Sequence, residues 1–181
     1  MIVIGITGHP VAGKDTIGDY LVTKGFKKYT FGDILREEMK LLNLPVDRSS
    51  MSKFSTERKA ELGNDYLCYV MLKKISGDTV TPGVRSTEEV RTFRKELGQK
   101  FNLFVVEAPI EKRYEWSKER GKEGDNVTFE EFKRIEDQER NGSTGSQEVD
   151  KVIEMADFII QNDGTKEDLY KKVDDLISSF K

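Results

Sequence analysis

The segment from residue 8 to residue 16, Gly-His-Pro-Val-Ala-Gly-Lys-Asp-Thr, constrains the fold more than any other part of this chain. The apolar run before it, residues 1–6, predicts a buried strand, and apolar residues recur at helical spacing directly after it. A loop bounded by Gly8 and Gly13 therefore joins a strand to a helix, with Lys14 at the mouth of that helix. This order of elements is the context of a phosphate-binding P-loop.

Elementary chemistry explains why such a loop binds phosphate. Successive backbone N–H groups turn inward and form a concave anion site, and the helix N-terminus adds free donors and a positive dipole end. Gly13 leaves room for a phosphate near the backbone, and Lys14 supplies a mobile charge for the β- and γ-phosphates of ATP. The alternative is a plain strand-to-helix turn with an incidental lysine. The predicted nucleotide contacts are Gly8, His9, Pro10, Val11, Ala12, Gly13, Lys14, Asp15 and Thr16.

The two residues after Lys14 are candidate ligands of Mg²⁺. Asp15 stands where this motif usually has Ser or Thr, and Thr16 follows it. A carboxylate can also hold Mg²⁺, which prefers oxygen ligands and keeps several of its waters. Asp15 and Thr16 are therefore the predicted metal ligands. His9, the one histidine, is interpreted as part of the loop geometry and not as a general base, because no Ser or Cys partners it in a recognisable arrangement.

The composition argues against several classes of protein. The 181 residues suit one compact domain, and the formal net charge of −3 gives no broad footprint for a nucleic-acid polymer. No apolar run approaches the roughly 20 residues of a membrane helix, and residues 1–7 lack the basic leader of a signal peptide. The single cysteine, Cys68, is expected to be a small buried side chain. We expect a cytoplasmic protein, monomeric or homodimeric, that meets neither membrane nor nucleic acid.

Strand-like and helix-like segments alternate along the chain, which predicts a parallel sheet covered by helices on both faces. The predicted strands are residues 1–6, 26–31, 79–81, 101–107 and 158–160. The predicted helices follow the P-loop as far as residue 24 and then span 32–42, 50–61, 64–75, 86–97, 110–120, 128–140, 149–153 and 165–180. Residues 31–76 form a helical insert, whose first helix has an apolar face made of Ile34, Leu35, Met39 and Leu42. Ligands of such sheets bind at the carboxyl ends of the strands.

Two arginines follow strands and would point toward the P-loop. Arg36 lies one helical turn after the second strand, just beyond Asp33, and Arg85 follows the third strand. Two arginines there can clamp a second phosphate group bidentately, and phosphoryl transfer needs mostly positioning and charge neutralisation. The alternative for each arginine is a surface salt bridge with a neighbouring glutamate. The predicted catalytic residues here are Lys14, Asp33, Arg36 and Arg85.

Basic residues also flank a polar loop at residues 121–127, which indicates a lid that closes over phosphates. These residues are Arg113, Arg120, Lys122 and Arg134. We predict a lid region over residues 113–140, with Arg120 and Arg134 as catalytic residues. The alternative is a charged helix pair supported by contacts such as Glu130 with Arg134. Trp116 is expected to pack rather than to act as a stacking platform.

Four short stretches resemble the nucleoside monophosphate kinase group of P-loop kinases. Residues 32–36, Gly-Asp-Ile-Leu-Arg, resemble the G-D-x-L-R segment of adenylate kinases, whose arginine holds the acceptor phosphate. Residues 83–86 resemble the D-G-x-R segment of archaeal adenylate-kinase-related proteins, except that Pro82 stands where those proteins have Asp. Residues 13–16 are similar to deoxynucleoside monophosphate kinases, and residues 156–165 look like the end of dephospho-CoA kinases.

These resemblances together imply a three-layer P-loop NTPase fold with a five-stranded parallel sheet in the order 2-3-1-4-5, a helical acceptor-binding insert and a small lid. They imply transfer of the γ-phosphate of ATP, with Mg²⁺, to a small-molecule phosphate acceptor. They also imply that the turn of Asp163, Gly164 and Thr165 borders the adenine of ATP. They disagree on the acceptor, which can be AMP, a deoxynucleotide or dephospho-CoA.

Pro82 keeps a second function open. With the usual acidic residue of that strand missing, the candidate carboxylates are Asp15, Asp33 and, as a weaker one, Glu107. The alternative to a kinase is an ATP-binding regulatory or interaction protein that kept the fold and lost turnover. Pro82 and the lysine in the lid favour that alternative, whereas Lys14 and the two arginines of the clamp favour the kinase.

Overall fold

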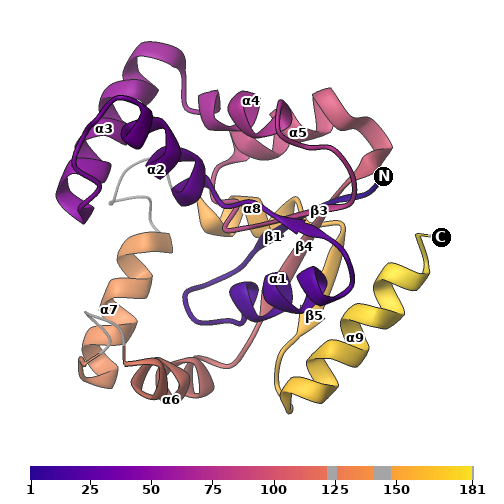
Figure 1. Ribbon diagram of the computed structural model, residues 1–181. Coiled ribbons are helices and arrows are strands. Elements are labelled where there is room, and N and C mark those ends of the chain that lie inside the picture. The colour runs from indigo at the N-terminus through magenta and orange to yellow at the C-terminus, as the bar shows by residue number, and fades with distance from the viewer. Residues whose placement is uncertain (122–125, 141–147, 181) are drawn as a thin grey trace.

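The structure is a computed structural model that describes residues 1–121, 126–140 and 148–180 (Figure 1). Within these residues, five strands form one sheet in the order β2-β3-β1-β4-β5, and each neighbouring pair is parallel, which confirms the predicted topology. The strands are β1 (Val3–Thr7), β2 (Lys27–Lys28), β3 (Thr79–Pro82), β4 (Phe101–Glu107) and β5 (Phe158–Gln161). Because the strands are parallel, their carboxyl ends meet at one edge, where the P-loop leaves β1.

Helices connect the strands and cover both faces of the sheet (Figure 1). They are α1 (Lys14–Thr23), α2 (Phe31–Leu41), α3 (Arg48–Leu62), α4 (Tyr66–Leu72), α5 (Thr87–Leu97), the 3-10 helix η1 (Gly98–Lys100), α6 (Ile110–Arg120), α7 (Phe129–Arg140), α8 (Val149–Glu154) and α9 (Lys166–Ser178). Figure 1 shows the pair α2 and α3 and the pair α6 and α7 on the side toward which the P-loop extends. No helix in the described part of the chain is both long enough and apolar enough to cross a membrane.

Two apolar layers hold the helices to the sheet. Successive residues of a strand face opposite ways, so β1 supplies Val3 to one layer and Ile4 and Ile6 to the other. The layer with Ile4 packs against Ile17 of α1 and against the inner face of α9. Burial of this apolar surface from both sides explains why the central strands are apolar throughout.

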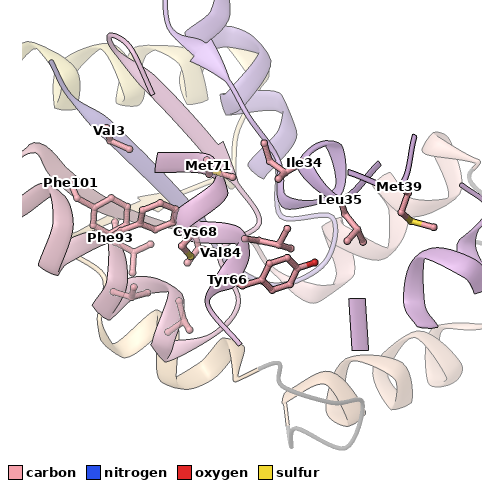
Figure 2. Packing of buried hydrophobic residues seen from close by; sticks show 14 residues of the cluster. Val3, Ile34, Leu35, Met39, Tyr66, Cys68, Met71, Val84, Phe93 and Phe101 are labelled. Carbon is pink, nitrogen blue, oxygen red and sulfur yellow. The ribbon is translucent and has the colours of Figure 1, made fainter. Parts of the chain in front are cut away.

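The layer that contains Val3 continues into the helical insert (Figure 2). Met71 of α4 and Phe93 of α5 lie fully buried in it, and the rings of Phe93 and Phe101 stack with centroids 5.1 Å apart. Cys68 is also fully buried, as predicted, and this burial raises the pKa of its thiol well above the usual value. The insert is therefore fastened to the sheet by a shared core.

Two predictions about the second strand and the helix that follows it are wrong in detail. The predicted strand at residues 26–31 shrinks to β2, because the Thr30 side chain accepts a hydrogen bond from the Asp33 backbone N–H and starts a helix at Phe31. Leu42, which we expected on the buried face, is 53% exposed because α2 ends at Leu41. The side chain of Leu42 therefore lies beyond the last turn that packs on the core.

Candidate functional site

The P-loop, residues 8–16, runs from the end of β1 into α1. Gly8 has a φ of +133° and Gly13 a φ of +105°, which residues with a Cβ rarely adopt. A Cβ on Gly8 would lie 2.3 Å from the carbonyl oxygen of Val106, and one on Gly13 would lie 2.6 Å from Nδ2 of Asn162. Both glycines are thus required by the close packing of the loop against the chain around β4 and β5.

Lys14 is the first residue of α1 and reaches back over the loop. Its ammonium group donates hydrogen bonds to the carbonyl oxygens of Gly8 at 2.7 Å and of His9 at 2.6 Å. The N-cap of α1 is Gly13, and no side-chain hydrogen bond caps this helix. The backbone donors of the first turn and the positive dipole end therefore favour a bound anion.

A cavity of about 700 Å³ lies beside the P-loop, and we call it the donor cavity. The P-loop contributes Val11, Gly13, Lys14, Asp15 and Thr16 to its wall. The facing walls come from α6, through Trp116 and Arg120, and from the turn after β5, through Gly164 and Thr165. Its volume is typical of a site for a small-molecule ligand. The structure therefore brings most of the predicted nucleotide contacts to one space.

The turn after β5 is tied to its neighbours on both sides. The carboxylate of Asp163 accepts a hydrogen bond from Lys172 at 2.9 Å, which lowers its pKa, and its carbonyl oxygen accepts one from Lys112 of α6. The amide of Asn162 donates to the carbonyl oxygen of Ala12 in the P-loop at 2.9 Å. Asp163 itself does not line the donor cavity and holds the turn in place.

A second cavity, of about 490 Å³, shares Lys14 and Asp15 with the first, and we call it the acceptor cavity. Arg36 of α2 and Arg85 after β3 both line it. These two arginines, far apart in the sequence, are therefore brought to one cavity. Besides Lys14 and the two arginines, Lys59 of α3 adds a fourth cation, which the sequence did not predict. Apolar wall is supplied by Phe31, Leu35 and Leu67.

Acidic groups set the electrostatics of the acceptor cavity. Asp33 does not line the cavity; it accepts a hydrogen bond from Arg36 at 2.8 Å and so positions the guanidinium group. Glu89 of α5 does line it, is only 8% exposed, and accepts hydrogen bonds from the N–H groups of Arg85 and Ser86. Burial raises the pKa of Glu89, although those two hydrogen bonds lower it in part.

Helices α6 and α7 make up most of the predicted lid region. Arg113 forms a buried ion pair with Glu136 of α7, and it also donates to the carbonyl oxygens of Ala108 at 2.9 Å and Pro10 at 3.3 Å. Arg113 therefore fastens both helices to the P-loop. Arg134 lines neither cavity: its side chain is 62% exposed and is bound to Glu131 at 2.6 Å. Lys122 and residues 123–125 of the predicted lid loop lie outside the described residues.

The remaining candidates lie close to the P-loop without lining a cavity. Nε2 of His9 is 3.7 Å from a carboxylate oxygen of Asp150 in α8, and Pro10 and Ala12 serve as hydrogen-bond acceptors for other segments. Glu107, at the end of β4, accepts a hydrogen bond from Gln161 at 2.6 Å. These contacts give the three P-loop residues and Glu107 a role in fixing the loop and its surroundings.

Two oxygen-bearing side chains are placed where a metal ion could accompany a nucleotide. Asp15 and Thr16 both line the donor cavity. Among the described residues no group of three or more His, Cys, Asp or Glu side chains gathers to form a metal cage. One carboxylate and one hydroxyl fit Mg²⁺, which takes few protein ligands and otherwise keeps water and phosphate oxygens.

The cavity walls include residues that were not predicted as binding residues, among them Lys59, Glu89, Trp116 and Asn162. Lys59 lies on α3, in which no residue is buried, so no apolar stripe in the sequence indicates which face meets the cavity. Glu89 completes a capping box with Ser86 at the start of α5, and the same carboxylate also lines the acceptor cavity. Asn162 directly follows β5, so its position at the carboxyl end of a strand was the available signal.

Solved structures share this fold. The chain superposes on the structure of TT1252 from Thermus thermophilus with a TM-score of 0.61 and 17% identity, over 99% of this chain and 98% of the other. A shikimate kinase from Acinetobacter baumannii in complex with shikimate gives a TM-score of 0.60 and 19% identity, over 100% of this chain and 95% of that one. At such identities the likeness shows the fold alone, which is that of P-loop kinases.

Relatives by sequence are UPF0200 proteins, and no family model matches the chain. One from Thermococcus gammatolerans is 35% identical over 187 positions, covering 99% of this chain and 95% of the relative. One from Thermococcus kodakarensis is 33% identical over 191 positions, covering 99% and 100%. The chain spans about half of a UPF0200/UPF0201 protein of Archaeoglobus fulgidus, which is 32% identical over 179 positions covering 96% of this chain and 54% of that protein. This chain belongs to the UPF0200 family.

Proposed function

We propose that this protein is an ATP-dependent kinase that transfers the γ-phosphate of ATP to a nucleotide-like acceptor. The observation that supports the proposal most is that the donor cavity and the acceptor cavity share Lys14 and Asp15. Phosphoryl transfer needs two substrates that meet at one point, where charge is neutralised, and little covalent chemistry from the protein. Two cavities that meet at the P-loop lysine satisfy this need.

On the donor side, the P-loop binds the triphosphate through its backbone donors. Lys14 exchanges its two carbonyl partners, Gly8 and His9, for oxygens of the β- and γ-phosphates. Asp15 and Thr16 hold Mg²⁺, which neutralises charge on the phosphate oxygens when bound. Arg120 adds a further cation from α6. The turn at Gly164 and Thr165 borders the adenine.

On the acceptor side, three cations besides Lys14 line the wall, and they favour an acceptor that carries phosphate. Arg36, Lys59 and Arg85 come from three different segments and line one cavity. A phosphomonoester or pyrophosphate fits such a set because arginine binds phosphate oxygens bidentately. The apolar wall, with Phe31 among its members, suits the flat base of a nucleotide. The acceptor classes are a nucleoside monophosphate and dephospho-CoA.

The alternative function is that of an ATP-binding regulatory or interaction protein with little turnover. Pro82 supports it, because this buried residue ends β3 and lines the acceptor cavity at the place where similar proteins have Asp. A proline there supplies no carboxylate for an acceptor or a metal ion.

The test is ADP release in a coupled assay, with ATP and Mg²⁺, across a panel of nucleoside monophosphates and dephospho-CoA. If the protein is a kinase, at least one acceptor raises ADP release above that seen with ATP alone, and Lys14→Ala abolishes the increase. If ATP binds and no acceptor in the panel raises ADP release, the proposed kinase activity is wrong and the regulatory function stands.

A further inference from the structure

One face of α6 lies along the donor cavity. Lys112, Trp116 and Arg120 are spaced four residues apart, so they lie on one face of the helix. Lys112 donates to the carbonyl oxygen of Asp163 in the turn after β5, while Trp116 and Arg120 line the donor cavity. Lys112 therefore ties α6 to the turn after β5, and the indole of Trp116 lies one helical turn further along the same face.

The two aromatic residues of α6 have different surroundings. Tyr114 packs against α7, with ring centroids 5.2 Å from Phe129 and 5.7 Å from Phe132. The indole of Trp116 is half-buried and makes no ring contact with another described aromatic residue. Tyr114 thus serves the packing of α6 on α7, and the Trp116 ring contributes to the wall of a cavity instead.

The donor cavity has apolar wall besides the indole. Val11 and Leu169 contribute apolar side chains to the same cavity, and Gly164 contributes backbone only. A Cβ on Gly164 would lie 2.6 Å from a carboxylate oxygen of Asp168, so a side chain is disfavoured there. An aromatic ring, aliphatic groups and bare backbone give the donor cavity apolar surface that suits the face of a heteroaromatic base, while the charged side chains of Glu119, Arg120 and Lys166 line other parts of its wall.

We propose that Trp116 is the base platform of the donor site: its indole stacks on the base of the bound nucleoside triphosphate. This inference rests on the proposed function, because it assigns the base-binding part of the same donor cavity. Base–aromatic stacking recognises the π-face that every nucleobase has. Arg120, one turn further along the row, is then left for the phosphate end of the nucleotide.

The chain has a single tryptophan, so its intrinsic fluorescence reports on this residue alone. Two probes with Mg²⁺ are titrated, ATP and inorganic tripolyphosphate, which has the phosphates without a base. We expect ATP to change the indole emission much more than tripolyphosphate does. Calorimetry then measures both affinities for Trp116→Ala, Trp116→Phe and Glu115→Ala, the last an exposed position of α6 outside the cavity lining.

The expected affinities distinguish contact with the base from contact with the phosphates. Trp116→Ala weakens ATP binding about fivefold to a hundredfold, Trp116→Phe retains most of it, and neither changes the affinity for tripolyphosphate. Glu115→Ala leaves both affinities unchanged. Circular dichroism checks that Trp116→Ala is folded, and the fluorescence titration of the wild-type chain tests the proposal even if that variant is not.

Any one of three results would overturn the proposal that Trp116 is the base platform. ATP saturates the wild-type protein without changing the indole emission, or Trp116→Ala binds ATP as tightly as wild type, or Trp116→Ala loses affinity for ATP and tripolyphosphate equally. In the last case the residue acts through the P-loop and not on the base. All three leave the proposed function intact, whereas a wild-type chain that binds neither probe overturns both.

Discussion

At the scale of single residues, Lys14 is the cation that both cavities share, and its ammonium group donates hydrogen bonds to two carbonyl oxygens of the P-loop. We predict that Lys14→Ala weakens the binding of MgATP by tenfold or more, because a hydrogen bond to a charged group is worth about 1.5–3 kcal/mol. Calorimetric titration measures this loss. Lys95→Ala, at a side chain that is 74% exposed, is the matched control. Equal ATP affinity and equal turnover in Lys14→Ala and wild type would contradict the assignment.

The arginines of the acceptor cavity make a different prediction. Arg36→Lys and Arg85→Lys keep the charge and lose the planar fork that binds phosphate bidentately. The expected loss is about 1.5–3 kcal/mol for each hydrogen bond to phosphate, or roughly tenfold to over a hundredfold in kcat/KM for the acceptor. The affinity for ATP should stay unchanged, since the P-loop is untouched.

Steady-state kinetics at varied acceptor concentration measures kcat/KM for the acceptor, and calorimetry measures the affinity for ATP. Arg91→Lys, on the exposed side of α5, is the control. Wild-type kcat/KM in both variants would show that these arginines do not hold the acceptor. A fall in ATP affinity with unchanged acceptor use would place them in the donor site instead.

At the scale of helices, α6 and α7 are joined by the buried ion pair of Arg113 and Glu136. Removing one partner leaves a buried charge uncompensated, so Glu136→Ala is predicted to lower the free energy of unfolding by about 3–5 kcal/mol. The double variant Arg113→Met/Glu136→Leu should recover part of this loss, because it leaves neither charge behind. Urea denaturation of Arg113→Met, of Glu136→Leu and of their double variant measures the coupling between the two side chains. A double variant as unstable as the sum of the two singles would mean that the two side chains do not interact.

The first turn of α5 gives a pH-dependent prediction. Glu89 completes the capping box with Ser86, and burial raises its pKa above the usual 4.5. A carboxyl group whose pKa is higher in the folded state stabilises the fold most at low pH, and this stability is lost as the pH rises through the folded-state pKa. Glutamine can also complete a capping box, so Glu89→Gln should gain stability relative to wild type as the pH rises above 4.5. Urea denaturation of both proteins over a pH series tests this, and a constant difference between them would contradict it.

At the scale of the whole molecule, local patterns predicted the sheet and the P-loop better than the walls of the cavities. The strand, loop and helix around Lys14 are contiguous in sequence, so one motif was enough to predict them. Lys59 reaches the acceptor cavity only because α3 packs beside α2 and α4, and an exposed charged helix carries no periodic signal for its orientation. Arg120 and Arg134 looked alike in the sequence, but only Arg120 lies on the wall of the donor cavity.

In the proposed function, a phosphoryl group passes between two small molecules that are bound in the donor cavity and the acceptor cavity. The most direct measurement follows the label from ATP labelled at the γ-phosphate, in the presence of Mg²⁺ and of the acceptor that raises ADP release most. We predict that the label appears on the acceptor in an amount equal to the ADP formed, and that this transfer is lost in Lys14→Ala. Label that remains in ATP, or that appears only as inorganic phosphate at a rate independent of the acceptor, would contradict it.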